Sequence, residues 1–392
     1  GTWTIYAVPE GTVVFPGEPL LRFHGTTTEA MLLETGLSMI MNHESLIATK
    51  ARRVRTVAPK DALMEFGLRR AQGHSAGLWG ARAAMIGGFN GTSNVEAGKR
   101  FGIPVLGTMA HSWVMSFDEE IDAFREYVRQ YHDNLILLAD TYNVLEMGVP
   151  HAIQVFKELK EEGRLPGKYG IRIDSGDIAY LSQEATRMFT EAGFPDAIIS
   201  GSNDLDEYTI QSLKAQGCTV TSWGVGTKII TADGTSALGG VFKMAVKEAD
   251  GKEVPVMKFS NDVEKMTNPG IKTVYRFYKK DTGKMITDLV CLHDEKAADG
   301  GDFTLVTESA KWRRKELKAG TYTVEELLKP VVENGRNLPL PALSEIIRYA
   351  DKQIDTLWPE YTRLLNPDLM EINLSDKLQT LKSELIRREL GE

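Results

Sequence analysis

One histidine, His111, stands out because of what precedes it. It lies in the string Gly107-Thr-Met-Ala-His-Ser112, which follows an apolar run at residues 103–106 that is typical of a β-strand. In α/β barrels, reactive side chains lie in the loops after the carboxyl ends of the strands, so a histidine here can face a site. For a lone histidine, a structural role with a hydrogen bond to a backbone carbonyl is the alternative interpretation.

An arginine and two aspartates occupy a comparable position further along the chain. Arg172 and Asp174 alternate along one predicted strand, so both side chains point to the same face, and Asp177 begins the next loop. A guanidinium binds anions through two parallel hydrogen bonds, and Mg²⁺ prefers one or two carboxylates together with substrate phosphates and water. The pattern indicates an anionic substrate with Mg²⁺ held by Asp174 and Asp177. An ordinary ion pair at a strand end is the alternative.

Glycine-rich strings after two later strands indicate a phosphate site. They are Ser200-Gly-Ser-Asn-Asp204 and Trp223-Gly-Val-Gly-Thr227. Barrels often bind phosphate there with backbone N–H groups and a helix N-terminus, and glycine lets the backbone approach the anion. Ser202, Asn203 and Thr227 can add side-chain donors. Each string alone is weak, because such turns are common and Asp204 could equally cap a helix.

These strings need a scaffold that positions them, and the periodicity of the chain supplies one. Apolar runs typical of strands alternate with amphipathic helical patterns. The predicted strands cover residues 62–67, 103–106, 135–140, 170–174, 197–200 and 219–223. The clearest helical patterns cover residues 117–131, 152–162, 178–192 and 204–215. Parallel strands need such crossovers, so the sequence predicts an α/β barrel or a doubly wound sheet.

The two ends of the chain show other patterns. Residues 3–23 alternate between apolar and polar side chains, which predicts a hairpin-like β unit. The dipeptide Asp250-Gly251 predicts a hairpin turn, and a second turn is expected at residues 279–283. Helices are predicted at residues 28–51, 343–365 and 374–390.

The composition excludes several classes of protein. The 392 residues, 42% of them hydrophobic, can fill the cores of two or three domains. A net charge of -8 argues against nucleic acid as a general partner, although local arginines can still bind small anions. Two cysteines are too few for a disulfide framework, and the chain has neither a long apolar run nor a signal peptide. We expect a cytoplasmic globular protein with no membrane partner.

Four strings in a fixed order resemble the nicotinate phosphoribosyltransferase family. They are Glu65-Phe-Gly-Leu-Arg-Arg-Ala-Gln-Gly73, Gly87-Gly-Phe-Asn-Gly-Thr-Ser-Asn94, Gly107-Thr-Met-Ala-His-Ser112 and Ala237-Leu-Gly-Gly-Val-Phe-Lys243. The resemblance implies an α/β fold, an irregular βα barrel at residues 56–275. A smaller α/β domain would be formed from the N-terminal and C-terminal parts, residues 1–55 and 276–392. The implied activity forms nicotinate mononucleotide and pyrophosphate from nicotinate and phosphoribosyl pyrophosphate, in NAD salvage.

The resemblance also implies roles for the strings around the histidine. In the family, the histidine of the Ala-His-Ser string is transiently phosphorylated by ATP, so His111 is expected to carry the phosphate, with Ser112 beside it. Arg172 is then expected to bind the nicotinate carboxylate, helped by Thr108. ATP is implied as a co-substrate and Mg²⁺ as the cofactor.

The remaining expected site residues come from the other strings. By resemblance, Arg69 recognises pyrophosphate or the pyridine. Arg70 is a weaker candidate, because one of two adjacent arginines usually makes a solvated or structural contact. The 5′-phosphate and ribose are expected to lie near Ser202, Asn203, Gly226, Thr227, Gly239, Gly240 and Lys243.

Two related activities are alternatives. The nicotinamide-using enzyme has an aspartate where this chain has Ser93, and the aspartate accepts a hydrogen bond from the carboxamide; a neutral serine avoids repelling a carboxylate. Quinolinate phosphoribosyltransferase shares the general fold but is not expected to carry Ala110-His-Ser112.

The start of the chain raises an alternative of another class. Family members carry an N-terminal segment before the part corresponding to Tyr6, and it supplies a tyrosine that stacks on the pyridine, often in a neighbouring subunit. This chain opens at Gly1 without an initiator methionine, so we expect a fragment or a processed piece. A catalytically incomplete nucleotide-binding protein is the corresponding alternative. The resemblance also implies a homodimer.

Overall fold

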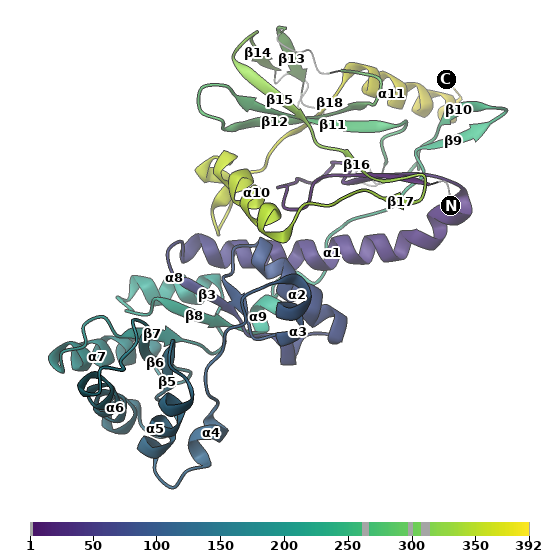
Figure 1. Ribbon diagram of the computed structural model, residues 1–392. Coiled ribbons are helices and arrows are strands. Elements are labelled where there is room, and N and C mark those ends of the chain that lie inside the picture. The colour runs from purple at the N-terminus through teal and green to yellow at the C-terminus, as the bar shows by residue number, and fades with distance from the viewer. Residues whose placement is uncertain (1–2, 261–265, 297–300, 307–313, 392) are drawn as a thin grey trace. The chain divides into compact units, whose positions relative to one another are not determined.

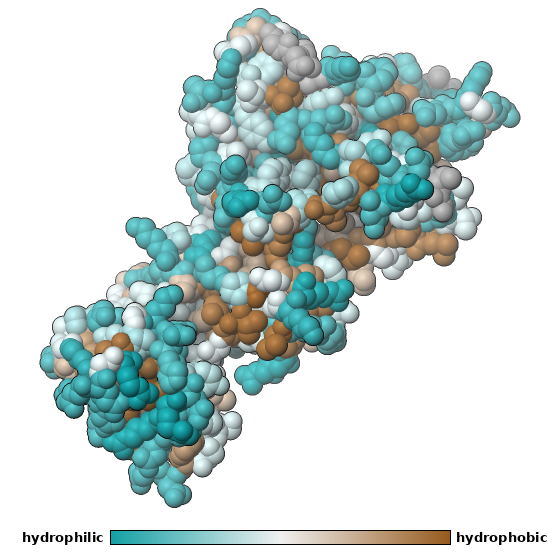
Figure 2. Space-filling view, viewed as in Figure 1, coloured by the Kyte–Doolittle hydropathy of each residue, from teal (hydrophilic) through white to brown (hydrophobic). Residues whose placement is uncertain are grey.

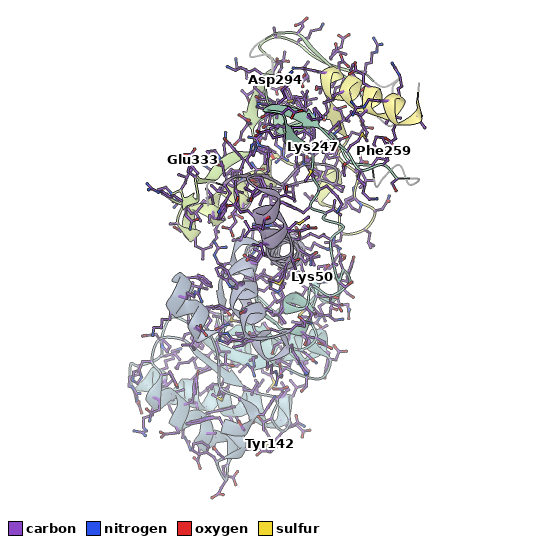
Figure 3. The ribbon with its side chains drawn as sticks, turned by 90° about the vertical axis from the view of Figure 1, so that its right-hand side faces the viewer. Lys50, Tyr142, Lys247, Phe259, Asp294 and Glu333 are labelled. Carbon is purple, nitrogen blue, oxygen red and sulfur yellow. The ribbon has the colours of Figure 1, made fainter. Side chains whose placement is uncertain are left out.

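The chain forms two compact units in the computed structural model, which describes residues 3–260, 266–296, 301–306 and 314–391. One unit is Asn42–Leu238, and the other combines Gly1–Met41 with Gly239–Glu392 (Figure 1). These boundaries differ from those expected at 55/56 and 275/276. Helix α1, Thr27–Val57, is one cause, because its second half belongs to the barrel unit. There Lys50, labelled in Figure 3, forms an ion pair of 2.8 Å with Glu207, whose side chain is buried.

The unit at residues 42–238 is built on a six-stranded parallel sheet in the order β4-β3-β8-β7-β6-β5. Its strands are β3 Ala62–Glu65, β4 Gly91–Thr92, β5 Leu135–Leu138, β6 Tyr169–Ile173, β7 Ile198–Gly201 and β8 Ser222–Val225. Within residues 42–238, all of which the structure describes, the two edge strands β4 and β5 do not pair with each other. The sheet therefore forms an open half-barrel, which confirms the expected irregular βα barrel.

Helices connect these strands and cover the sheet. They are α2 His74–Ile86, α3 Val95–Phe101, α4 His111–Met115, α5 Glu120–Gln130, α6 Val149–Glu161, α7 Ile178–Glu191, α8 Glu207–Ala215 and α9 Thr227–Ile230. Figure 1 shows α5, α6 and α7 clustered beside β5, β6 and β7. All four residues of β5 are buried, as expected of a parallel strand covered on both faces. Phe156 packs its ring 5.0 Å from that of Tyr169 and joins α6 to β6.

Three predicted elements of this unit are placed differently. Residues 103–106 form only an isolated bridge between Val105 and Thr92, because Pro104 has no N–H to contribute to a ladder. The strand expected at 219–223 is β8, Ser222–Val225. Helix α8 begins at Glu207 rather than 204, because Asp206 caps it by accepting a hydrogen bond from the Thr209 N–H at 2.7 Å.

The other unit is mainly antiparallel β-structure with helices. One sheet has the order β17-β16-β1-β2, a second has the order β15-β11-β12-β18, and β9-β10 and β13-β14 are separate hairpins. The strands are β1 Thr4–Ala7, β2 Leu21–His24, β9 Val246–Ala249, β10 Lys252–Pro255, β11 Lys272–Lys279, β12 Met285–Leu292, β13 Phe303–Val306, β14 Arg314–Leu317, β15 Tyr322–Glu326, β16 Lys329–Glu333, β17 Arg336–Asn337 and β18 Ile372–Leu374. Its α-helices in the described residues, besides the first half of α1, are α10 Leu343–Thr356 and α11 Asp376–Leu390, and a short 3₁₀ helix spans Pro359–Thr362.

The expected hairpins of this unit are confirmed. Strand β1 pairs antiparallel with β2, and β11 pairs with β12 around the turn predicted at residues 279–283. Asp250 and Gly251 join β9 to β10 with φ angles of 52° and 71°, the left-handed conformation that an Asp-Gly hairpin turn requires. Among the described residues, no helix is both long and apolar enough to cross a membrane.

Candidate active site

His111 is the first residue of α4 and lies between two carboxylates. Its Nε2 atom is 3.8 Å from Oδ1 of Asp140 and 3.6 Å from Oδ2 of Asp174, and its Nδ1 atom is 3.1 Å from the Thr141 hydroxyl. Strands β5 and β6 are paired, with Leu138 opposite Arg172, so the residues that follow the two strands meet at one edge of the sheet. The His111 side chain is 39% exposed, which leaves the ring accessible to a small molecule.

Asp140 is the most deeply buried of these groups. Its side chain is 2% exposed, and Oδ2 accepts hydrogen bonds from the Asp174 N–H at 3.1 Å and from the Ser175 hydroxyl. Oδ1 is buried with no hydrogen-bond partner among the described residues. Burying a carboxylate oxygen without a hydrogen-bond donor costs free energy, so this atom is placed to accept a hydrogen bond from His111 Nε2 or to face a bound cation.

Arg172 and Thr108 come together as the sequence suggested. Arg172 Nη1 donates to the Thr108 hydroxyl at 2.7 Å, and Arg172 Nε is buried with no partner among the described residues. Burial lowers the pKa of the Arg172 guanidinium, while the nearby Asp174 and Asp140 carboxylates oppose that shift. A half-buried guanidinium with a donor left over is suited to a small carboxylate or phosphate.

The two aspartates expected to hold Mg²⁺ have different surroundings. Asp174 accepts a hydrogen bond from the Ser202 hydroxyl through Oδ1, and its Oδ2 faces His111. Asp177 is exposed and caps α7, because its Oδ1 accepts from the Tyr180 N–H at 3.0 Å. In the described part of the chain, no group of three or more His, Cys, Asp or Glu side chains could hold a metal alone.

That donor set nevertheless fits Mg²⁺, which takes one or two protein carboxylates and completes its shell with substrate phosphates and water. Asp174 and the unpartnered oxygen of Asp140 are the better placed donors, since one oxygen of Asp177 is already committed to the helix cap.

The other half of the sheet carries the remaining barrel residues. Arg69 and Arg70 are exposed in the short 3₁₀ helix after β3, and Ser93 is half-buried after β4. Gly226 precedes α9, and Thr227 is the first residue of that helix. All these loops lie at the carboxyl edge of the parallel sheet.

Two expected ribose-phosphate residues lie in the loop after β7. Ser202 is buried, and its hydroxyl donates to Asp174. Asn203 has a φ of 117°, and its side-chain oxygen accepts from the Asp204 N–H at 2.8 Å. Because a non-glycine residue seldom adopts that conformation, this backbone is strained in the way often found at functional loops.

Other expected residues are not brought to these groups within the barrel unit. Ser112 is in α4 but is exposed and makes none of the contacts of His111. Gly239, Gly240 and Lys243 are exposed residues of the other unit, where the Lys243 ammonium donates to the Phe242 carbonyl at 3.1 Å.

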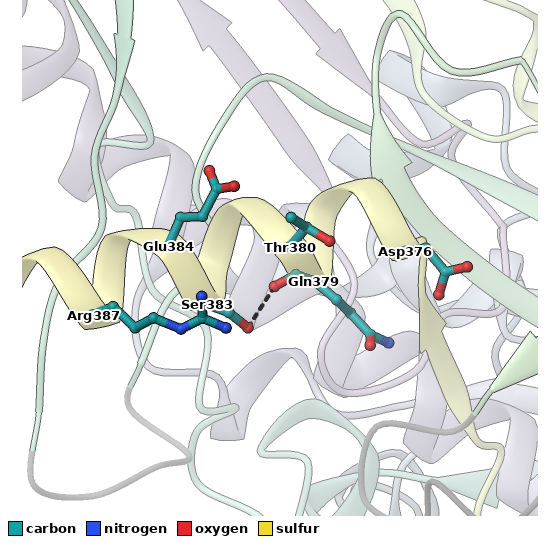
Figure 4. A pocket seen from close by; sticks show the side chains of 6 residues that line it. All are labelled: Asp376, Gln379, Thr380, Ser383, Glu384 and Arg387. Atoms are coloured by element: carbon teal, nitrogen blue, oxygen red, sulfur yellow. Dashed lines mark hydrogen bonds between the residues drawn. The ribbon is translucent and has the colours of Figure 1, made fainter. Parts of the chain in front are cut away.

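A hollow along α11, also in the other unit, has none of these groups. Figure 4 shows it lined by Asp376, Gln379, Thr380, Ser383, Glu384 and Arg387. All of them lie on that single helix, so the hollow is a surface depression with no converging chemical groups.

Sequence reasoning missed Asp140, Thr141 and Glu65 as site residues. A signal for Asp140 was present, because this carboxylate ends an apolar strand directly before a polar loop. That loop continues to Tyr142, which Figure 3 shows at the outer edge of the barrel unit. Glu65 carried a weaker signal, since it appeared only as the first letter of a recognised string. It is fully buried and accepts a hydrogen bond from Thr92, the last residue of β4.

Family models of known proteins match most of the chain. The model described as the nicotinate phosphoribosyltransferase (NAPRTase) family matches residues 62–296, and the model of the nicotinate phosphoribosyltransferase C-terminal domain matches residues 271–382.

Individual relatives extend this similarity. Nicotinate phosphoribosyltransferase of Bacillus subtilis is 42% identical over 97% of this chain and 77% of its own length. The human nicotinate phosphoribosyltransferase is 32% identical over 97% of this chain and 80% of its own length.

Solved structures agree. The crystal structure of human nicotinic acid phosphoribosyltransferase superposes with a TM-score of 0.84 at 30% identity, over 98% of this chain and 82% of that one. A nicotinate-nucleotide pyrophosphorylase from Pyrococcus furiosus superposes with a TM-score of 0.70 at 24% identity, over 91% of this chain and 81% of that one, and supports the fold alone.

Proposed function

The chain belongs to the nicotinate phosphoribosyltransferase family, and we propose that its chemistry is carried out by the groups around His111 at the carboxyl edge of the half-barrel. It is a nicotinate phosphoribosyltransferase, an enzyme of NAD salvage, with small molecules as substrates. The reaction joins nicotinate to the ribosyl carbon of phosphoribosyl pyrophosphate and releases pyrophosphate. The observation that carries the site assignment is that His111 Nε2 lies within 4 Å of both Asp140 and Asp174, beside the half-buried Arg172.

The reaction sets two tasks for the protein. The bond between ribose C1 and pyrophosphate breaks as the pyridine nitrogen attacks, and positive charge develops on the sugar while negative charge leaves with pyrophosphate. Arginines can neutralise that leaving group, and the exposed guanidinium of Arg69 is our candidate. The pyridine must be held in line, which is a positioning task. Arg172 performs it by binding the nicotinate carboxylate through the donor that Thr108 leaves free.

His111 is proposed to accept a phosphoryl group from ATP. The Thr141 hydroxyl contacts Nδ1 and orients the ring, while Nε2 faces Asp140 and Asp174. A hydrogen bond from one ring nitrogen to a neighbouring group fixes the tautomer, and therefore which nitrogen remains free to react. Mg²⁺, when held by Asp174 with Asp140 or Asp177, would neutralise the phosphate charge next to these carboxylates.

Two further features of the proposal concern the whole molecule. We propose a homodimer in the cytoplasm. The first half of α1 exposes Met31, Leu32, Met39 and Ile40, of which Leu32 is 78% exposed, and brown surface is visible along this helix in Figure 2. Exposed apolar side chains gathered on one helix commonly mark protein–protein contacts. Sedimentation of the purified chain tests this proposal, because a monomer at all concentrations would refute it.

The activity is tested by mixing the protein with phosphoribosyl pyrophosphate, Mg²⁺, ATP and either nicotinate or nicotinamide. We expect nicotinate mononucleotide, with ATP hydrolysed as it forms. Preferential use of nicotinamide would support the nicotinamide-using enzyme instead. Binding of nicotinate without any turnover would support a catalytically incomplete nucleotide-binding protein.

A further inference from the structure

Glu65, at the carboxyl end of β3, is fully buried, with 0% of its surface exposed. No basic side chain in the described part of the chain forms an ion pair with it, and burial raises its pKa. Hydrogen bonds from the Thr92 hydroxyl and the Gly67 N–H oppose that shift. Glu65 therefore acts through hydrogen bonds, and its partners indicate what it does.

The carboxyl group joins the turn after β3 to the end of strand β4, where the Ser93 loop begins. Its Oε1 atom accepts from the Gly67 N–H at 2.5 Å, in the turn that leads to Arg69. Its Oε2 atom accepts from the Thr92 hydroxyl at 2.6 Å, and the Glu65 main-chain carbonyl accepts from the Ser93 N–H at 3.0 Å. A single residue thus contacts both the arginine turn after β3 and the Ser93 loop after β4.

Each of these loops is held firmly beyond the contact with Glu65. Gly67 accepts from the Arg70 N–H at 2.8 Å, and a Cβ placed on it would lie 2.7 Å from the Gly226 carbonyl, so this turn fits tightly against the loop after β8. The Thr92 hydroxyl accepts from the Asn94 N–H at 3.0 Å, and Asn94 caps α3. Movement of either end of the Glu65 bridge would displace a loop that carries a proposed substrate contact.

We propose that Glu65 is a positioning residue of the reaction, whose carboxyl group sets the spacing between the arginine turn and the Ser93 loop. The inference rests on the proposed function, in which Arg69 binds pyrophosphate or the pyridine and Ser93 lies beside the pyridine. Glu65 touches no substrate. It acts by keeping two substrate-binding loops in register, so its loss should change substrate affinity more than the chemical step.

The test compares four variants with the wild-type enzyme. Glu65→Ala and Thr92→Val should each raise KM for nicotinate about tenfold, with a smaller change in kcat. Glu65→Gln should restore KM, because its amide oxygen can accept from the Gly67 N–H and the Thr92 hydroxyl, which donates to Glu65 in the wild type, can turn to accept from its NH₂ group. Thr92→Ser should likewise keep KM near the wild-type value, since it keeps the hydroxyl.

A second readout does not depend on activity. In Glu65→Ala, amide hydrogen exchange should become faster in both residues 66–70 and residues 92–95. Ser182→Ala is the matched control, because Ser182 is another fully buried polar side chain whose hydroxyl donates to Ala179 within α7. It should lower the melting temperature without raising KM or exchange in those two segments.

Several outcomes would overturn the proposal. An unchanged KM in Glu65→Ala and Thr92→Val, with only a lower melting temperature, would make Glu65 a structural brace. A Glu65→Gln variant as impaired as Glu65→Ala would show that a charge is needed. If Glu65→Ala does not fold, Thr92→Val and Glu65→Gln decide the question. Absence of nicotinate turnover in the wild type would refute the proposed function instead, and hydrogen exchange would still show whether the two loops are coupled.

Discussion

Replacement of Arg172 by glutamine gives the sharpest test of substrate recognition. Arg172 Nη1 donates to the Thr108 hydroxyl, whereas its Nε is buried with no partner among the residues that the structure describes, so that edge of the guanidinium is the one that a carboxylate can satisfy. Arg172→Gln removes the positive charge and the Nε donor but keeps a polar side chain. The carboxylate of nicotinate loses its charged partner in this variant, whereas nicotinamide has no carboxylate to be affected.

The expected magnitude follows from the bond that is lost. A hydrogen bond to a charged group contributes about 1.5 to 3 kcal/mol, which corresponds to a loss of affinity of roughly 10- to 150-fold. The contact between Arg172 and the nicotinate carboxylate would be partly shielded from water, since burial already lowers the pKa of Arg172. We therefore expect the loss of affinity to fall within this range. Binding of nicotinamide should change by less than about threefold, because it gains nothing from the positive charge.

Isothermal titration calorimetry with each ligand separately measures both changes. Thr108→Val is the matched control. It removes the partner of Nη1 but leaves the guanidinium, so nicotinate binding should weaken by less than in Arg172→Gln. Equal losses for nicotinate and nicotinamide would refute the assignment and move Arg172 to general phosphate binding. A melting temperature close to that of the wild type would show that the variant is folded.

Three further predictions concern other groups. Incubation with labelled ATP and Mg²⁺ should give an acid-labile, base-stable phosphate that His111→Ala lacks, and label retained in that variant would remove the proposed role. Ser93→Asp should lower nicotinate turnover roughly tenfold or more, because like charges about 4 Å apart repel by about 4 kcal/mol at an effective dielectric of 20 before screening; wild-type kinetics would show that Ser93 does not face the pyridine. Burial lowers the pKa of Lys272 from its usual value of 10.5 to about 8. The free-energy cost of burying the charged ammonium is therefore present in full below pH 8, and it is relieved as the pH rises from 8 to 10.5. The free energy of unfolding of the wild type, relative to Lys272→Met, should therefore increase by up to about 1.4 kcal/mol per pH unit in this window, and a difference that stays constant in urea unfolding between pH 8 and 10 would contradict this.

The sequence by itself determined the local elements and the order of the site loops. Apolar runs at residues 135–140 and 170–174 match β5 and β6, because side chains of a parallel strand must be apolar on both faces. The hairpin turn at Asp250 and Gly251 was equally local, since only a few residue types adopt its backbone conformation. The family resemblance assigned Arg172 and Thr108 to one site, but it gave no distance between their side chains.

Tertiary structure alone decided which groups meet. Asp140 meets Asp174 beside His111 because β5 pairs with β6 in a particular register, and nothing near Asp140 in the chain encodes that pairing. Glu65 was recognised only as part of a string, and its role became visible when β4 placed Thr92 against it. The boundary inside α1 was likewise hidden, since one continuous helix serves both units. Periodicity reports the surroundings of one segment, whereas the site and the division into units depend on contacts between segments far apart in the chain.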